Sequence, residues 1–296
     1  MEIIFLGTSS MVPTKERNQT AIFMSYKNEG ILVDCGEGTQ RQFKLAGRSI
    51  SKITRILISH WHGDHVLGLP GLMQSLAASE YDRKLMIYGP KGSKKRFKAM
   101  FEAFVFDKPL DFQIEEVEPG IFFENSEFRI IAYSLVHGID TLGFRFEEKD
   151  RLRIDVKKAK KLGLPDGPLL GQLQENKSIT HKGKKILPKD VTYTVEGLKI
   201  GIISDTSLCD SCYKIAEGVD VLISEATYTS DLNDKAEEYN HMTAKNAGLI
   251  ASQANSKKLY LIHLSARYKS TNDILEDAKS VFEESYVAQD LMKIKI

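Results

Sequence analysis

The chain has 296 residues, and its 41 lysines and arginines nearly balance 40 aspartates and glutamates, for a formal net charge of +1 at pH 7. This length can bury a sizeable core, and we expect one main domain over 1–296 that carries an insertion. The N-terminus has no signal-peptide pattern and no apolar run reaches the roughly 18 residues of a membrane span, so we expect a cytoplasmic protein with no membrane contact.

Short apolar runs bounded by turn residues predict strands along the whole chain. They cover 3–6, 21–24, 30–33, 55–58, 84–88, 128–133 and 142–146, then 191–195, 199–203, 219–223 and 258–262. Apolar residues at helical spacing predict helices over 38–46, 68–79, 91–104, 243–252 and 271–286. Hairpins in each half, with helices after strands, predict an α/β fold of two packed mixed sheets covered by helices.

Side chains that bind metals follow several of these strands. His60-Trp61-His62-Gly63-Asp64-His65 comes directly after an apolar run, and three imidazoles with a carboxylate would be costly to bury unpaired. Nitrogen and carboxylate ligands together suit a borderline divalent metal. His137, Asp205 and His263 follow three further strands. A single residue at a strand end commonly makes only a turn, but this recurrence predicts one metal site at the strand ends.

Positive charge is concentrated in one segment. Residues 149–189 hold 12 lysines and arginines against 4 aspartates and glutamates, a local charge of +8, so the remainder carries −7. Such a run is usually a solvated face, but its concentration in one insert is also typical of a polyanion-binding surface.

Two cysteines form a C-x-x-C motif, Cys209-Asp210-Ser211-Cys212. Zinc ribbons and redox sites use this spacing, but no second motif completes a four-sulfur site, so a structural or incidental role is favoured. With Cys35 the chain has three cysteines, an odd number that argues against a disulfide framework.

The H-x-H-x-D-H run with a distant histidine, an aspartate and a last histidine resembles the metallo-β-lactamase superfamily. The resemblance covers nearly the whole chain and implies an αβ/βα four-layer sandwich that holds two Zn²⁺ per subunit. It assigns one zinc to His60, His62 and His137, the other to Asp64, His65 and His263, and a bridging role to Asp205. Two such ions can activate a shared water, and Asp64 would orient this nucleophile and accept its proton.

Three loops narrow the resemblance to the RNase Z family, the tRNA 3′-processing endonucleases. The run 13–18, Pro-Thr-Lys-Glu-Arg-Asn, matches their P-x-K-x-R-N loop. The run 224–227, Ser-Glu-Ala-Thr, resembles their H-E-A-T loop, with Ser224 in place of the first His. The run 263–268 resembles their H-S-T loop, with Ala266 in place of the Thr. The resemblance implies that the substrate is bound by Thr8, Ser9, Lys15, Arg17, Asn18, Thr227, Ser265 and Arg267.

His241 matches the family histidine that protonates the leaving 3′ oxygen. Glu225 would set its tautomer and raise its basicity, a pairing that phosphodiester cleavage can use. The alternative is a residue that only precedes the start of a helix at Thr243.

The basic segment 149–189 resembles the family's flexible arm, an exosite with a Gly-Pro motif that clamps the tRNA elbow. With few core-forming apolar residues it should be mobile without ligand, and the alternative is a disordered lysine-rich loop of no function. The residues concerned are Gly167 and Pro168 in a Gly/Pro-rich centre, flanked by Lys157, Lys158, Lys160, Lys161, Lys182, Lys184 and Lys185.

The leading hypothesis is a zinc-dependent endoribonuclease that cleaves the 3′ trailer from precursor tRNA after the discriminator nucleotide. It leaves a 3′-hydroxyl on the tRNA and a 5′-phosphate on the trailer, and the resemblance implies a homodimer. A second hypothesis is a small-molecule phosphodiesterase or other hydrolase of the superfamily, which would have no use for a +8 exosite. A third is a non-catalytic RNA-binding module, but structural zinc sites are closed and usually rich in sulfur.

Overall fold

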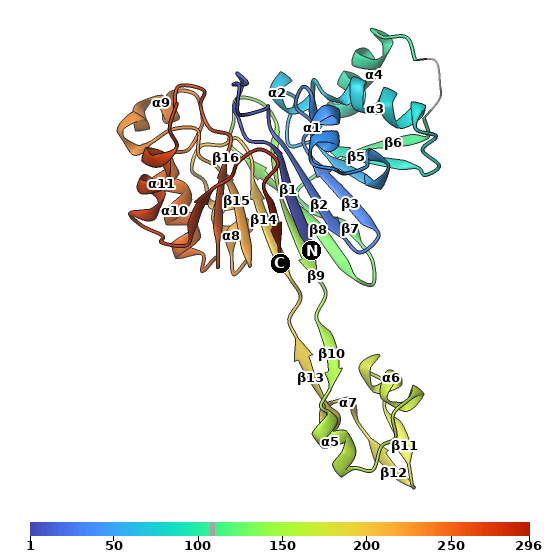
Figure 1. The fold of residues 1–296 in the computed structure, drawn as a ribbon. Helices are drawn as coiled ribbons and strands as arrows, with labels where there is room; N and C mark the ends of the chain where they lie inside the picture. Colours follow the sequence, from blue (N-terminus) through green and yellow to red (C-terminus); the bar gives the residue numbers. More distant parts are fainter. Residues whose placement is uncertain (107–109) are drawn as a thin grey trace. The chain divides into compact units, whose positions relative to one another are not determined.

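Two seven-stranded sheets frame the protein in the computed structural model, which describes residues 1–106 and 110–296 (Figure 1). In the first sheet, the neighbours from β18 to β3 are antiparallel and those from β3 to β6 are parallel. Its order is β18 (Lys293–Lys295), β1 (Glu2–Gly7), β2 (Ala21–Tyr26), β3 (Glu29–Val33), β4 (Arg55–Leu57), β5 (Leu85–Gly89) and β6 (Phe112–Glu116).

The second sheet contains a run of four parallel strands, from β14 to β17. Parallel strands bring their carboxyl ends to one edge, so the loops that follow them gather there. The order is β17 (Ser285–Val287), β16 (Leu259–Ile262), β15 (Val221–Glu225), β14 (Lys199–Ile203), β9 (Thr141–Glu148), β8 (Phe128–Leu135) and β7 (Gly120–Glu124).

Helices cover the outer face of each sheet (Figure 1). The first sheet packs against α1 (Thr39–Leu45), α2 (Gly63–Val66), α3 (Leu69–Ala78) and α4 (Ser93–Glu102), and the second against α8 (Asp210–Ala216), α10 (Ala244–Gln253) and α11 (Asn272–Lys279). Between the sheets, the rings of Phe5 and Tyr260 lie 5.6 Å apart. The predicted four-layer α/β sandwich is therefore confirmed. The loops add η1 (Ile50–Lys52), η2 (Ser230–Leu232) and α9 (Asn233–Glu238).

Every predicted strand is present, with ends moved by at most two residues. One predicted helix is wrong in its second half. The pattern over 271–286 predicts a single helix, but α11 ends at Lys279 and β17 begins at Ser285, where it pairs with Leu259 at the edge of the second sheet. Tertiary pairing overrides local helix periodicity here.

The residues divide into two compact units, which we call the main unit (Met1–Phe123, Ile130–Phe146 and Ile200–Ile296) and the basic unit (Glu124–Arg129 and Glu147–Lys199). The basic unit contains two short antiparallel strand pairs, β10 with β13 and β11 with β12. Its elements are β10 (Arg151–Ile154), α5 (Val156–Lys161), α6 (Pro168–Gln174), β11 (Ile179–His181), β12 (Lys184–Ile186), α7 (Pro188–Val191) and β13 (Thr192–Val195).

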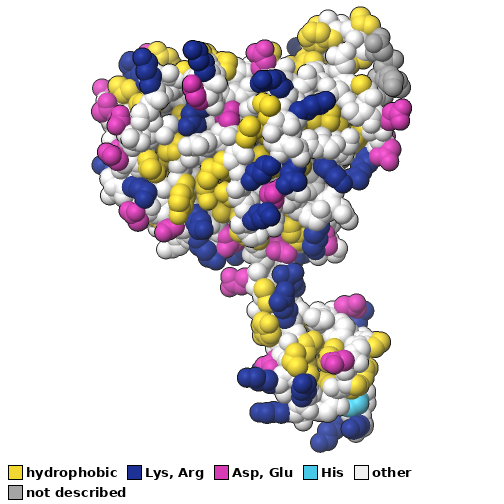
Figure 2. All heavy atoms as spheres, in the orientation of Figure 1, with side chains coloured by type: hydrophobic (Ala, Val, Ile, Leu, Met, Phe, Trp, Pro, Cys, Tyr) yellow, Lys and Arg dark blue, Asp and Glu magenta, His cyan; other side chains and the backbone are white. Residues whose placement is uncertain are grey.

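The basic unit has a hydrophobic core of its own. Leu173 and Val191 are fully buried there, and Ala159, Leu164, Ile179 and Ile186 complete the cluster. The expectation that this segment has few core-forming residues is therefore wrong, because apolar residues that are scattered in the sequence meet in the fold. Its lysines lie outside this core, and dark blue side chains mark lysines and arginines on its surface in Figure 2.

None of the helices in the described part of the chain combines the length and the apolar character that a bilayer crossing requires.

Candidate metal centre and active site

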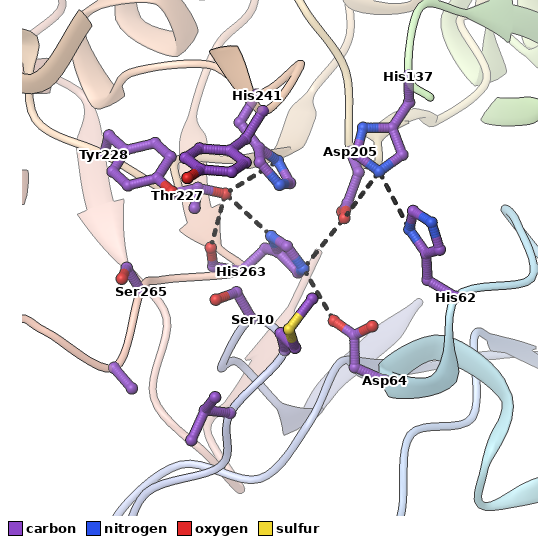
Figure 3. A pocket seen from close by; sticks show the side chains of 14 residues that line it. Ser10, His62, Asp64, His137, Asp205, Thr227, Tyr228, His241, His263 and Ser265 are labelled. Carbon is purple, nitrogen blue, oxygen red and sulfur yellow. Dashed lines mark hydrogen bonds and ion pairs between the residues drawn. The ribbon is translucent and has the colours of Figure 1, made fainter. Parts of the chain in front are cut away.

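The side chains predicted as metal ligands come together from loops at the ends of four strands. Figure 3 shows His62, Asp64, His137, Asp205 and His263 facing one another across a cavity. The loop after β4 continues into α2 and brings the histidine-rich run, and the other ligands follow β8, β14 and β16. Overlapping groups of potential ligand atoms lie within 4.8 Å of one another: His60, His62 and His137; His60, His65 and Asp205; Asp64, His65 and His263.

Asp205, a member of the second group, lies between the first group and the third. One oxygen of its carboxylate, Oδ2, is 3.2 Å from His263 Nε2 and 3.4 Å from His65 Nε2. The same oxygen is 3.7 Å from His60 Nε2 and 3.9 Å from His137 Nε2. A carboxylate in this position can face two cations at once.

The donor set fits divalent metal ions. His65 Nε2 and Asp205 Oδ1 are buried and have no hydrogen-bond partner among the described residues, a costly state that a cation relieves. Burial opposes ionisation of Asp64, but the hydrogen bond with His263 and the proximity of His65 hold the pKa of its carboxyl below the usual range. Burial, with the neighbouring histidines, lowers the pKa of His60 and His62, so their lone pairs are available.

Asp34 orients one of these ligands, and the sequence reasoning missed it. Its carboxylate accepts hydrogen bonds from His65 Nδ1 at 2.7 Å, from the Ser59 backbone N–H at 2.7 Å and from the Ser59 hydroxyl at 2.7 Å. This turns His65 Nε2 toward the centre, as outer carboxylates do for metal-bound histidines. Asp34 directly follows β3, so the strand-end rule that found the other ligands would have found it too.

Two further histidines are held in the same way. His137 Nδ1 lies 2.9 Å from the carbonyl oxygen of Asn240, and His263 Nδ1 lies 3.0 Å from the hydroxyl of Thr227. Each bond fixes the ring and leaves Nε2 facing the centre.

His241 and Glu225 form a pair beside the metal centre. Glu225 is fully buried; its Oε1 is 3.0 Å from His241 Nδ1, and its Oε2 accepts a hydrogen bond of 2.6 Å from the Thr227 hydroxyl. Burial alone would lower the pKa of His241, but the Glu225 carboxylate raises it to about 9. The imidazole is therefore a protonated group at the wall of the cavity.

The cavity has a volume of about 360 Å³ and opens over the ligands. Besides His62, Asp64, His137, Asp205 and His263, its lining comprises Ser10, Met11, Val12, Thr227, Tyr228, Tyr239, His241, Ser265 and Ala266. Thr227 and Ser265 were expected at the substrate, and the wall contains both.

Thr8 and Ser9, which were expected to bind substrate, lie under the wall. Both are fully buried, and their hydroxyls donate hydrogen bonds to Asp290 at 2.7 Å and to the Val12 carbonyl at 2.8 Å. The next residues along the chain line the cavity instead, beginning with Ser10.

The loop 13–18 contains both exposed and inward-facing side chains. Arg17 donates to the Thr8 hydroxyl at 2.6 Å and to the Ala288 carbonyl at 2.8 Å, and Asn18 donates to the Glu37 carbonyl at 2.7 Å. Lys15 is exposed and lines a separate hollow. These bonds give Arg17 and Asn18 a role in fixing the loop, whereas the Lys15 side chain is exposed to solvent.

Two predicted groups remain to be placed. The Arg267 guanidinium lies over the Tyr228 ring at 4.9 Å, and its Nε donates to the Ser265 hydroxyl at 3.0 Å. The predicted arm residues all lie in the basic unit. They are exposed there: Lys157, Lys158, Lys160 and Lys161 on α5, Gly167 and Pro168 at the start of α6, and Lys182, Lys184 and Lys185 on the β11–β12 hairpin.

The chain is similar to known proteins along its whole length. It is 42% identical to the ribonuclease Z of Methanothermobacter thermautotrophicus, in an alignment that spans 100% of this chain and 97% of that protein. The human tRNase Z, short form, matches with a TM-score of 0.74 at 27% identity, over 100% of this chain and 99% of that one. The metallo-β-lactamase fold protein YhfI of Bacillus subtilis, at 18% identity, matches in fold with a TM-score of 0.72 over 99% of this chain and 98% of that one. A family model described as Anti-Pycsar protein Apyc1 matches residues 1–102.

Asp34→Asn is expected to weaken metal binding by about ten- to a hundredfold. The Asp34 carboxylate now accepts hydrogen bonds from the Ser59 N–H, the Ser59 hydroxyl and His65 Nδ1. The NH₂ group of an amide cannot accept, so at least one of these three bonds would be lost. Competition with a chromophoric chelator measures the affinity, and circular dichroism checks the fold. Asp82→Asn, at an exposed position, is the matched control. Equal affinities for the two variants would show that Asp34 does not orient a ligand.

Proposed function

The chain belongs to the ribonuclease Z family, and from this membership we propose that it removes the 3′ trailer of precursor tRNA. As a family member it is a hydrolase, an endoribonuclease of the metallo-β-lactamase superfamily. The cut falls after the discriminator nucleotide and leaves a 3′-hydroxyl on the tRNA and a 5′-phosphate on the trailer. One observation carries the proposal: a single cavity is lined both by potential metal ligands and by His241, a proton donor held by a buried glutamate.

The proposed cofactor is a pair of zinc ions. His60, His62 and His137 would hold one; Asp64, His65 and His263 the other, with Asp205 facing both, and the overlapping ligand groups support this division. Bound zinc supplies Lewis-acid stabilisation of a phosphodiester's charge and a water acidic enough to attack near neutral pH.

Asp64 acts on the attacking water. Its carboxylate stays ionised because its pKa is lowered, and only one of its oxygens, Oδ2, contacts His263 and His65. The other oxygen is free to accept a hydrogen bond from the water and then its proton.

His241 acts on the leaving group, whereas Asp64 acts on the attacking water. With Nδ1 bonded to Glu225, its Nε2–H is the donor left for substrate. The leaving 3′ oxygen of the tRNA is a poor leaving group until it takes a proton, and a positioned imidazolium supplies one. Until His241 gives up this proton, the Glu225 carboxylate stabilises the positive charge on its ring.

Aromatic side chains give the cavity a wall suited to nucleotides. Tyr239 is 54% exposed there, and Tyr228 lies beneath Arg267. Bases stack on such rings without a requirement for sequence, which suits an enzyme that accepts many tRNAs.

The basic unit is the proposed tRNA-binding surface outside the cavity. Its exposed lysines can neutralise phosphates, and its core keeps them on a shaped support. The exposed Gly167–Pro168 turn, where Gly167 has φ 136°, adds a contact edge. The proposal includes a homodimer as the working form, which the mass in solution would test.

The purified, zinc-loaded protein is expected to cut a 3′-extended tRNA transcript once, just past the discriminator nucleotide. Chelation and Asp64→Ala should each reduce cleavage to background, because both remove the activated water, while Asp82→Ala should cut normally. A sequencing gel maps the cut. Intact RNA alongside rapid hydrolysis of small phosphodiesters or thioesters would instead identify a small-molecule hydrolase.

His241→Ala is expected to slow RNA cleavage by about 10²- to 10⁴-fold, the usual contribution of a general acid. Bis-p-nitrophenyl phosphate should be much less affected, because p-nitrophenolate leaves without a proton. Steady-state rates on the two substrates measure this difference within one variant. If both substrates slow equally, His241 does not protonate the leaving group.

Replacing Lys157, Lys158, Lys160 and Lys161 with alanine should raise KM for precursor tRNA and flatten its dependence on salt, by a log–log slope of about 0.7 to 0.9 per lost phosphate contact. Hydrolysis of bis-p-nitrophenyl phosphate should not change. Titrations at several salt concentrations measure the slope. The matched control removes four exposed lysines of the main unit, Lys44, Lys52, Lys235 and Lys258. Equal changes in the two variants would contradict an exosite on the basic unit.

A further inference from the structure

Cys209 ends the loop that leads from the metal centre into α8, and Cys212 lies beside it in the first turn of that helix. Their sulfur atoms are 3.6 Å apart, in contact but not bonded, and Cys209 is four residues after Asp205. The sequence alone favoured a structural or incidental role for this C-x-x-C motif. A contact of this kind between two thiols, one of them partly exposed, points to chemistry that the tRNA-cleavage proposal does not use.

The two thiols differ in the way that a reactive pair requires. Cys209 is partly exposed, whereas Cys212 is fully buried beneath it. The hydrogen bond with Cys212 lowers the pKa of Cys209 to about 6, so Cys209 is a thiolate at neutral pH. The same contact, together with burial, raises the pKa of Cys212, which keeps its proton and donates it to the neighbouring sulfur. An accessible thiolate beside a protonated partner is the arrangement of a dithiol that attacks disulfides.

We propose that Cys209 and Cys212 form a thiol–disulfide exchange site whose substrates are low-molecular-weight disulfides of the glutathione type. The Cys209 thiolate attacks one sulfur of the disulfide, a new S–S bond forms, and one thiolate leaves. Cys212 then attacks Cys209 Sγ, which breaks the mixed disulfide, and its proton passes to the second thiolate as that thiolate leaves. The protein dithiol is oxidised to a disulfide, and the small disulfide is reduced to two thiols.

Closure of this disulfide would move Cys209, which lies in the segment that follows Asp205. A disulfide holds its sulfurs about 2.05 Å apart, so the two atoms must approach by about 1.5 Å from their present 3.6 Å. Cys209 Sγ also lies 3.9 Å from the Thr206 hydroxyl. A movement of Cys209 is therefore transmitted to the residue next to Asp205.

Thr206 and Ser207 tie this loop to the other parts of the site. The Thr206 backbone N–H donates to Glu225 Oε1 at 2.7 Å, and the Thr206 hydroxyl accepts from the Val136 N–H at 3.0 Å. The Ser207 N–H donates to the Val136 carbonyl at 2.8 Å, one residue before His137. These bonds connect the segment after Asp205 to the segment before His137, and both residues are potential metal ligands. We infer that oxidation of the cysteine pair shifts these ligands and lowers metal affinity.

Cys35 provides an internal control. It is fully buried, and burial raises the pKa of its thiol to about 12, so it should not react under native conditions. Any thiol reactivity of the folded protein should therefore belong to the pair.

The experiment exposes the reduced protein to glutathione disulfide, then alkylates it and maps the cysteines by mass spectrometry. The peptide that contains both residues should lose two hydrogens and resist alkylation until dithiothreitol is added. Cys212→Ser should stop at a glutathione adduct on Cys209, and Cys209→Ser should not react. No reaction in the parent protein, or equal reaction of Cys212 in the Cys209→Ser variant, would overturn the proposal.

The effect on the metal centre is measured on the same samples, without RNA. Competition with a chromophoric chelator should show zinc affinity about tenfold weaker after oxidation, restored by dithiothreitol, and unchanged by the same treatment in Cys209→Ser. Unchanged affinity in a fully oxidised protein would refute the coupling to Asp205. Protection of both cysteines by added zinc would instead show that the pair is a metal ligand. Because neither readout involves cleavage, these outcomes are independent of the tRNA proposal.

Discussion

Holding two carboxylates and several imidazoles out of water at one edge of the sheets is the constraint on which the rest of the site depends. An ionised carboxylate in the interior is tolerated only when it is paired and hydrogen-bonded. The protein fixes three of the surrounding histidines from behind: His65 through Asp34, His137 through the Asn240 carbonyl, and His263 through Thr227. His65 Nε2 and Asp205 Oδ1, the buried ligand atoms with no hydrogen-bond partner in the described part of the chain, are where cations would bind.

The metal-binding part and the proton-donating part of the site share their supports. Glu225 accepts from the Thr206 N–H, beside Asp205, and from the Thr227 hydroxyl, which also contacts His263. Groups joined in this way do not respond independently to substitution. A change near Glu225 therefore alters both the acid and the metal ligands, and the loop that contains Cys209 belongs to the same connected set.

The sequence predicted the metal ligands because they are chemically rare and follow apolar strands, and the structure brings all of them together. Asp34 also directly follows a strand, so the same rule would have found it. Thr8 and Ser9 were expected at the substrate from the resemblance, but their hydroxyls bond to Asp290 and to the Val12 carbonyl inside the protein, which a sequence motif does not show. The bond of Arg17 to the Ala288 carbonyl and the core of the basic unit depend on contacts between residues distant in sequence, which local patterns do not contain.

The antiparallel pairing of β10 with β13 has a consequence for how such proteins diversify. Because Arg151 lies opposite Val195, the segment enters and leaves through two adjacent strands, and β9 and β14, which precede and follow it, are themselves neighbours in the second sheet. The intervening residues can lengthen, shorten or be exchanged at the genetic level while the hydrogen bonding of that sheet is retained. Substrate range and bond-breaking chemistry can thus evolve on separate stretches of one gene.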